Sequence, residues 1–262
     1  MGNGHSNQGD DLEQLLDRLS DQTAVQPNER LRLEHGPDTT TARIVDLITP
    51  LGKGQRVLLP SPPKAGKTTI LQKIAHAVDE NFPDVRQYAL LIDERVEEVT
   101  DFKRNIPSEV RASSIDQHPE NHVEVAEGTY KDAIEAVFRG EDVLVLLDSL
   151  TRLARTYNKT VKHSGRTLSG GLSANALERP RQLFGTARNV EDGGSLTVVA
   201  SALIDTGSRM DEVIFQEFKG TGNAELVLDR ELAEHRLWPA VDIEGSGTRQ
   251  EAKIMTDLEY DK

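Results

Sequence analysis

The sequence of 262 residues contains no cysteine, and aromatic residues make up only 4% of it. Without cysteine, disulfides and thiolate metal sites are excluded, and we expect a reducing, cytoplasmic setting. No apolar run approaches the ~20 residues that a membrane-spanning helix needs, and the first residues carry no apolar signal-peptide core. The net charge of −13 argues against a broad basic surface for nucleic acid. It still allows a few loop lysines to grip a single strand.

The composition and hydrophobic pattern of the chain change at about Thr41. Residues 1–40 are polar, acidic and rich in Gly, Asn and Gln, which predicts a largely disordered tail. A short helix could interrupt it, either packed loosely on the domain or docking a partner, because four leucines have helical spacing: Leu12, Leu15, Leu16 and Leu19. From residue 41 to 262, short apolar runs alternate with amphipathic stretches. This alternation predicts one α/β domain with a mainly parallel, twisted sheet and helices on both faces.

The expected elements follow from these runs. We expect strands over residues 57–59, 88–92, 143–147 and 196–203. We expect helices over residues 68–78, 123–138 and 177–190.

The most informative segment is VLLPSPPKAGKTTILQKIAHAV, residues 57–78. An apolar run leads into a turn, then Gly66-Lys67-Thr68, then an amphipathic stretch. Backbone N–H groups of such a loop, together with the helix N-terminus, cradle phosphate oxygens. Lys67 would then reach the β- and γ-phosphates, and the Thr68 hydroxyl would bind Mg²⁺. The full P-loop motif expects glycine where Ser61 stands, so its strand–loop–helix context carries the prediction; the alternative is a lysine-bearing turn before an ordinary helix.

Two further apolar runs end in acidic residues. Residues 143–147 lead into Asp148, and residues 88–92 lead into Asp93 and Glu94. ATP chemistry needs a carboxylate for Mg²⁺ and a group that orients or deprotonates the attacking water. Asp148 is the candidate metal ligand and Glu94 the candidate for the water, whereas Asp93 caps or positions the loop. The alternative for each acid is an N-cap of the next helix.

Longer segments resemble the ATPase domain of the transcription termination factor Rho family: LLIDERVEEVTDFKR, LLDSLTRLARTYN, SGGLSANALERPRQLFGTARNVEDGGSLTVVASALIDTGSRMDEVI, EFKGTGNAELVLDR and GSGTRQE. The PPKAGKT loop is similar too, and the resemblance covers roughly residues 41–251. It implies a RecA-like P-loop NTPase that assembles as a ring hexamer and binds ATP and Mg²⁺ between subunits. Such a motor pulls single-stranded RNA through its centre, acts as an RNA-dependent ATPase and helicase, and works on RNA polymerase in transcription termination.

The resemblance also implies roles for single residues. Glu94 matches the catalytic glutamate, Arg249 matches an arginine finger given to the neighbour's ATP, and Trp238 stands where the family has a phenylalanine that stacks on adenine. The remaining nucleotide-contacting positions are the loop and interface residues Ser61, Pro62, Pro63, Lys64, Ala65, Gly66, Lys67, Thr68, Thr69, Arg95, Asp148, Arg152 and Arg236. Arg95 is counted with Glu94, Lys67 and Arg249 in the catalytic set.

Two loops match those that face RNA in the family's pore. The first spans residues 162–171, and the second is Phe218-Lys219-Gly220-Thr221-Gly222. Glycine lets the backbone approach sugar and phosphate closely, and Lys and Arg pair with phosphate. The candidate RNA contacts are Lys162, Gly165, Arg166, Thr167, Lys219 and Gly220. The alternative is that these loops are flexible connections.

The sequence departs from the family pattern at its ends. The family carries an RNA-binding module with an OB-fold before the motor, whereas here a segment of about 40 residues with acidic net charge precedes the domain. The family also has more helical sequence after the arginine finger. We therefore keep three hypotheses. The first is a Rho-like RNA translocase. The second is a truncated, ATP-binding interaction or regulatory module, which the charge favours. The third is another RecA-like machine, such as a rotary or strand-exchange ATPase.

Overall fold

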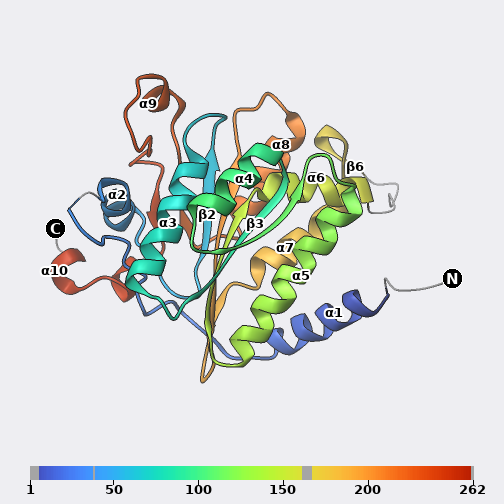
Figure 1. Cartoon of the computed structure of the whole chain (residues 1–262), viewed down its shortest axis with the longest axis horizontal. Coiled ribbons are helices and arrows are strands. Elements are labelled where there is room, and N and C mark those ends of the chain that lie inside the picture. The colour runs from blue at the N-terminus through green and yellow to red at the C-terminus, as the bar shows by residue number, and fades with distance from the viewer. Residues whose placement is uncertain (1–5, 38, 161–166, 261–262) are drawn as a thin grey trace.

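The computed structural model describes residues 6–37, 39–160 and 167–260. A central sheet lies between two layers of helices (Figure 1). The strands of this sheet are β1 (Ala24–Val25), β2 (Arg56–Ser61), β3 (Arg86–Glu94), β4 (Glu109–Ser114), β5 (Asp142–Asp148), β8 (Arg188–Val190), β9 (Ser195–Leu203), β10 (Ala224–Glu225) and β11 (Gly247–Thr248). A separate hairpin consists of β6 (Thr167–Leu168) and β7 (Leu172–Ser173).

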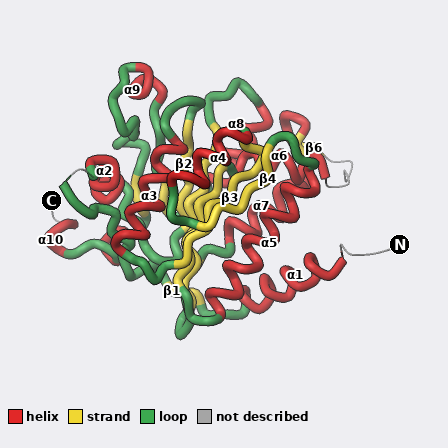
Figure 2. The backbone as a smooth tube through the Cα atoms, in the orientation of Figure 1, coloured by secondary structure: helices red, strands yellow, loops and turns green. Residues whose placement is uncertain are grey.

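The helices flank the sheet on both sides (Figure 2). They are α1 (Ser6–Ser20), α2 (Thr40–Ile48), α3 (Lys67–Asn81), α4 (Val96–Asn105), α5 (Pro119–Phe138), α6 (Leu150–Thr160), α7 (Glu178–Gly185), α8 (Arg209–Lys219), α9 (Arg230–Glu234) and α10 (Asp257–Tyr260). Short 3₁₀ turns cover Ser169–Gly171, Ala174–Leu177 and Glu251–Lys253. Within the described part of the chain, no helix is long and apolar enough to span a bilayer.

The sheet is mainly parallel, as the sequence predicts. Its order is β11-β10-β2-β9-β5-β3-β4, and every pair from β10 to β4 is parallel. β11 joins β10 antiparallel, and β8 joins both β1 and β9 antiparallel. Because parallel strands end at one edge, the loops that follow β2, β3, β5 and β9 meet there.

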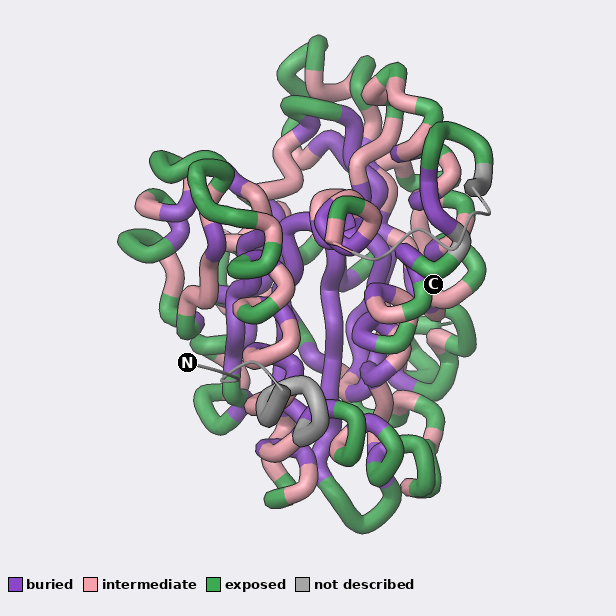
Figure 3. Tube along the Cα trace, turned by 90° about the vertical axis from the view of Figure 1, so that its right-hand side faces the viewer, coloured by how far each residue is buried: buried purple, intermediate pink, exposed green. Residues whose placement is uncertain are grey.

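Both faces of the sheet are buried, which Figure 3 shows as a purple band through the central strands. Along β5, Val143, Val145 and Leu147 point into a core shared with α1, α5, α6, α7 and α8. Leu144 and Leu146 point into a second core shared with α2, α3 and α4. This arrangement explains why the strand is a continuous apolar run rather than an alternating one.

The helix expected over residues 177–190 is wrong in its second half. α7 ends at Gly185, and Arg188–Val190 form β8. Pairing decides this outcome, because β8 bonds β9 on one side and β1 on the other. The sequence pattern gave no sign of β1, since it lies in the acidic N-terminal segment.

The four leucines with helical spacing in the N-terminal segment lie in α1. α1 runs along α5 (Figure 1), and Leu12, Leu16 and Leu19 are buried in the same core as the strands. The polar side of α1 is anchored by Glu13, whose carboxylate lies 2.6 Å from Arg179. Further on, the backbone N–H groups of Leu33 and Glu34 donate to the buried Asp46 carboxylate. Three leucines on one helix face thus find an apolar surface that composition alone does not reveal.

Candidate active site

The predicted phosphate loop joins β2 to α3. Gly66 is the N-cap of α3 with φ of 91°, and Lys64 also has a positive φ of 67°. A side chain at Gly66 would collide with Trp238, whose Cζ3 lies 2.9 Å from the position of a Cβ atom. Ser61, by contrast, does not have a positive φ, and its hydroxyl donates to the Pro62 carbonyl at 3.0 Å. Serine is therefore accommodated where the motif expects glycine.

Lys67, the first residue of α3, lies between two buried carboxylates. Its Nζ is 2.7 and 2.8 Å from the two Asp148 oxygens and 3.3 Å from Glu94 Oε1. Asp148 ends β5 and Glu94 ends β3, and these strands are parallel neighbours. Ser201 in β9 donates to Asp148 Oδ1 at 2.8 Å. The fold thus brings together three groups that the sequence predicted from separate segments.

The acids and the lysine shift one another's protonation. Burial, followed by the negative charge of Asp148, raises the pKa of Glu94 from 4.5 to about 7, although Lys67 and Arg152 oppose this shift. Burial opposes the charge on Lys67, yet the carboxylates of Asp148 and Glu94 raise its pKa above the ordinary value. Glu94 Oε2 is buried, and no group in the described part of the chain forms a hydrogen bond with it. Glu94 is therefore a carboxylate that can exchange a proton near neutral pH.

A bulge at Asp93 aims Glu94 toward the lysine. The register of β3 against β4 shifts between Ile92 and Glu94, and Asp93 between them has φ of 56°. Arg152 of α6 donates from Nη1 to the Asp93 carbonyl, and its Nε lies 3.2 Å from Glu94 Oε1. That Nε–H is not aligned for a hydrogen bond, so the contact with Glu94 is an ion pair. A bulge redirects the following side chain, which gives Asp93 the positioning role that the sequence left open.

The residues predicted to contact adenine or a neighbouring subunit are largely exposed to solvent. Trp238 is 55% exposed, and one edge of its ring lies over Gly66. Arg236, two residues earlier, is exposed and has φ of 59°. Arg95 follows Glu94 but turns away: its side chain is 67% exposed and lies 4.0 Å from Glu98. Of the two predicted arginines, Arg152 contacts the group formed by Lys67, Glu94 and Asp148 (the acid cluster), and Arg95 does not.

Arg249 lies at the opposite edge of the sheet from the phosphate loop. Its backbone N–H donates to the Asn223 carbonyl at 2.9 Å, and the Asn223 side chain accepts from the Arg56 N–H at 2.8 Å. Arg56 begins β2, whereas Ser61 ends it, so the strand separates the two ends by about 16 Å. The exposed Arg249 therefore cannot reach the Lys67 cluster of its own chain.

The two predicted RNA loops lie apart. Lys162, Gly165 and Arg166 fall outside the described residues, while Thr167 lies in β6. Gly170, in the same loop, packs so closely on the start of α8 that a Cβ atom there would lie 2.7 Å from the Met210 nitrogen. Lys219 and Gly220 are exposed at the other end of α8, about 16 Å away along the helix axis. The first loop thus neighbours Arg209, which sequence reasoning did not select.

Ser201 and His122 were also missed as site neighbours. Ser201 is in the middle of an apolar strand, and only the order of strands places it against Asp148. His122 is 4% exposed near the start of α5, with Nε2 3.8 Å from Asp93 Oδ1. No local motif marks either residue.

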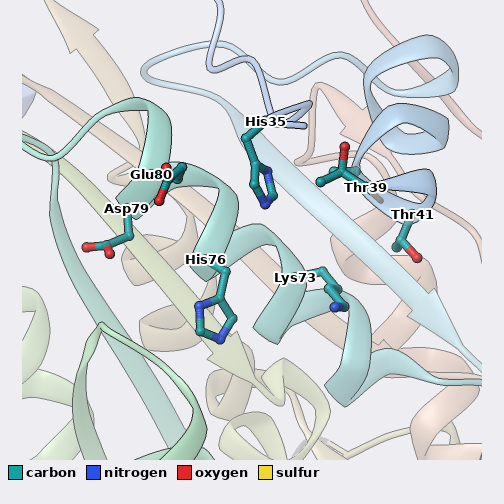
Figure 4. Close-up of a pocket in the computed structure, with 8 residues that line it drawn as sticks. His35, Thr39, Thr41, Lys73, His76, Asp79 and Glu80 are labelled. Carbon is teal, nitrogen blue, oxygen red and sulfur yellow. The ribbon is translucent and has the colours of Figure 1, made fainter. Parts of the chain in front are cut away.

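A surface cavity of about 390 Å³ lies between α2 and α3, away from the acid cluster (Figure 4). It mixes cationic, anionic and hydroxyl groups, and its lining comprises His35, Thr39, Thr41, Ala42, Lys73, His76, Asp79 and Glu80. No predicted site residue in the described part of the chain lines it, so it is separate from the site described above.

The fold and the loop-to-acid geometry define a nucleotide-binding domain of the RecA-like ATPase class. The chain belongs to the ATP synthase alpha/beta family, whose nucleotide-binding domain it matches over residues 41–248. A type III secretion system ATPase from pathogenic bacteria superposes with a TM-score of 0.77 at 24% identity, over 90% of this chain and 66% of that one. The assembled ATPase EscN of enteropathogenic E. coli gives 0.76 at 23%, over 91% and 56%. These likenesses confirm the predicted fold class.

Within that class, the chain is similar to transcription termination factor Rho. It is 54% identical to Rho of Borreliella burgdorferi over 92% of this chain and 47% of that protein. It is 55% identical to Rho of Haemophilus influenzae over 92% and 58%, and 56% identical to Rho of Streptomyces lividans over 89% and 33%. The resemblance noted from the motifs is thereby confirmed. The chain spans about half the length of the first two relatives.

Proposed function

We propose that this chain binds ATP with Mg²⁺ and hydrolyses it as the motor domain of a Rho-like RNA translocase. The observation that carries the proposal is the Lys67 ammonium group, which lies between Asp148 and Glu94 at the ends of two parallel strands. Lys67 would bind the transferred phosphate, and Glu94 would orient the attacking water and accept its proton. Arg152 would hold Glu94 in place.

The residues beside Lys67 fit a magnesium ion that arrives with its nucleotide. In the described part of the chain, no group of three or more His, Asp or Glu side chains could hold a metal by itself. Mg²⁺ is commonly held by one or two protein oxygens and by substrate phosphates. Thr68 and Asp148 would supply those oxygens, and the ion would neutralise charge on the phosphates.

Hydrolysis is proposed to occur between subunits of a ring, with a hexamer as the expected assembly. The support is the position of Arg249, which is exposed and lies a full strand length from its own phosphate loop. Only a second copy could bring this arginine to the nucleotide. Mixing inactive Arg249→Ala chains with inactive Glu94→Gln chains tests this: recovered ATPase activity would support sharing, and none would refute it.

The RNA path is proposed to include the first turn of α8. Gly170 packs on the first turn of α8, so Arg209 stands beside the first predicted RNA loop. Lys219 remains the candidate of the second loop. Because the relatives are named for transcription termination, we propose single-stranded RNA and RNA polymerase as partners and the cytoplasm as the compartment. Comparing Arg209→Ala with Lys219→Ala for RNA-stimulated ATPase activity will assign the contact to one end of the helix.

The deciding experiment is steady-state ATP hydrolysis at low salt, with and without pyrimidine-rich single-stranded RNA. Lys67→Ala should lose turnover, whereas Lys73→Ala, an exposed lysine on the same helix, should retain it. Stimulation by RNA in the wild type would support the motor over a module that binds ATP without responding to RNA. Equal turnover in Lys67→Ala and Lys73→Ala would overturn the phosphate-site assignment.

The second candidate is an ATP-binding interaction or regulatory module without translocation. The net charge of −13 favours it, because charge of this sign repels the RNA backbone. ATP binding without RNA-stimulated turnover would support it. Binding can be followed through Trp238, since it is the single tryptophan of the chain and borders the phosphate loop.

A further inference from the structure

A buried histidine lies directly behind the bulge that aims Glu94. His122 is in the first turns of α5 and is 4% exposed. Its Nδ1 lies 2.6 Å from Ser113 Oγ of β4, and its Nε2 lies 3.8 Å from Asp93 Oδ1. The ring therefore bridges the neighbouring strand and the bulge residue.

The partners of Ser113 decide which nitrogen of the ring carries the proton. Ser113 Oγ donates its hydrogen to Gln117 Oε1 at 2.7 Å, so toward His122 it can only accept. Nδ1 of His122 is therefore the protonated nitrogen, and Nε2 of the neutral ring faces the Asp93 carboxylate with a lone pair. An attractive contact forms at that face only when Nε2 also takes up a proton.

Asp93 is shared between His122 and the arginine that contacts Glu94. Its Oδ2 lies 3.9 Å from Arg152 Nη1, which also donates to the Asp93 carbonyl, and Arg152 Nε lies 3.2 Å from Glu94 Oε1. We propose that His122 is a positioning residue that acts through Asp93 and Arg152 to set the orientation and basicity of Glu94. The inference rests on the proposed function, in which Glu94 activates water.

Protonation of His122 changes how Asp93 is shared. Burial lowers the pKa of His122; the Asp93 carboxylate opposes this, and the positive charges of Lys159 and His118 add to it. The ring is therefore neutral at pH 7. In acid, the imidazolium pairs with Asp93 and weakens the hold of Asp93 on Arg152. The arginine charge then acts more fully on Glu94, which becomes a weaker base.

The test compares His122→Asn, whose amide keeps a donor for Ser113 but cannot become charged, with the wild type. His76→Asn, an exposed histidine on α3, is the matched control. The readouts are kcat and KM for ATP between about pH 5.5 and about pH 8.5, and thermal unfolding to verify folding. His122→Ala is the second variant, which also removes the donor.

We expect His122→Asn to keep kcat and KM for ATP within about twofold of the wild type above about pH 7.5, because its uncharged amide replaces the neutral ring, and to differ from the wild type in acid. On the acid side of the pH profile, the fall in kcat should depend on about two protons in the wild type and on about one in His122→Asn. A fall that still depends on about two protons in the folded variant would mean that His122 only fills space. His76→Asn should match the wild type.

A measurement without turnover separates this inference from the proposed function. The pKa of His122 can be followed by NMR in the wild type, in Arg152→Gln and in Arg95→Gln, an exposed control arginine. Arg152→Gln should raise the His122 pKa, because Asp93 is then free to pair with the imidazolium; Arg95→Gln should not. An unchanged pKa in Arg152→Gln would overturn the coupling even in a chain that hydrolyses ATP. Absence of hydrolysis in the wild type would refute the proposed function alone.

Discussion

Replacement of Glu94 by glutamine is expected to stabilise the nucleotide-free chain while it abolishes hydrolysis. Glu94 is 2% exposed and shares Lys67 with the equally buried Asp148. One ammonium group does not fully compensate two buried carboxylates, so the pKa of Glu94 rises to about 7. Glutamine keeps the shape of the side chain and removes the charge that the fold disfavours.

The magnitude follows from the linkage between protonation and folding. From 4.5 to about 7, the shift of the Glu94 pKa corresponds to about 3 kcal/mol at 1.36 kcal/mol per unit. Between these values the folded chain binds more protons than the unfolded chain, so stability falls as pH rises from 4.5 to about 7 and then stays lower. The Gln variant lacks this fall. Its advantage should be near zero at about pH 4 and largest above about pH 7, with about 3 kcal/mol as the upper limit.

Urea unfolding at about pH 5 and about pH 8 measures this difference directly. Glu97→Gln, an exposed position in the first turn of α4, is the control and should change little at either pH. The reasoning is refuted if Glu94→Gln gains no stability over the wild type at the higher pH, or if its advantage is the same at both. Either result would mean that Lys67 and Arg152 fully compensate the Glu94 carboxylate.

Three further predictions follow from other contacts. Trp238→Ala should weaken ATP binding by about 1–3 kcal/mol, whereas Trp238→Phe should bind nearly as the wild type does, because both aromatic rings can stack on adenine; calorimetric titration measures both. Leu19→Ala should destabilise the fold by about 2–5 kcal/mol, because Leu19 is 1% exposed in the core beneath α1. Leu15→Ala, at a half-buried position, is the control, and both are measured by denaturant unfolding. Equally small effects of the two substitutions would mean that α1 contributes little to the stability of the core. Ser201→Ala should raise the Mg²⁺ concentration for half-maximal ATPase activity about tenfold through the Asp148 orientation it removes, and an unchanged magnesium titration would contradict that role.

The sheet and the main site residues could be predicted because their signals are local. An apolar run that ends in Asp148 or Glu94 predicts a buried strand and also the edge of the sheet at which the acid lies. Gly66-Lys67-Thr68 after another run places the lysine at the beginning of a helix on that same edge. Parallel pairing then brings these segments together without any further information in the sequence.

Contacts made by pairing across long sequence separations could not be predicted. Ser201 lies 53 residues after Asp148 and looks like an ordinary strand residue. β8 exists because β1 and β9 flank it, although residues 177–190 have a helical pattern. The leucines of α1 have helical spacing in the sequence, but the composition of an acidic segment does not disclose that they pack on α5. In β8 tertiary pairing overrides the local signal, and in the other two cases it supplies a partner that no local signal marks.

The same ion pairs that identify the site also set a limit on it. In this structure Lys67 is bonded to both Asp148 oxygens, so under the proposed function phosphate and Mg²⁺ would have to compete with an internal ion pair for these groups. That competition would reduce the affinity of the proposed site, and the buried charge of Glu94 is expected to lower the stability of the empty domain. Glu94 retains a pKa of about 7 under these conditions, which suits a group that accepts a proton from water near neutral pH. Stabilising this domain by neutralising Glu94 should therefore remove the chemistry that the arrangement supports.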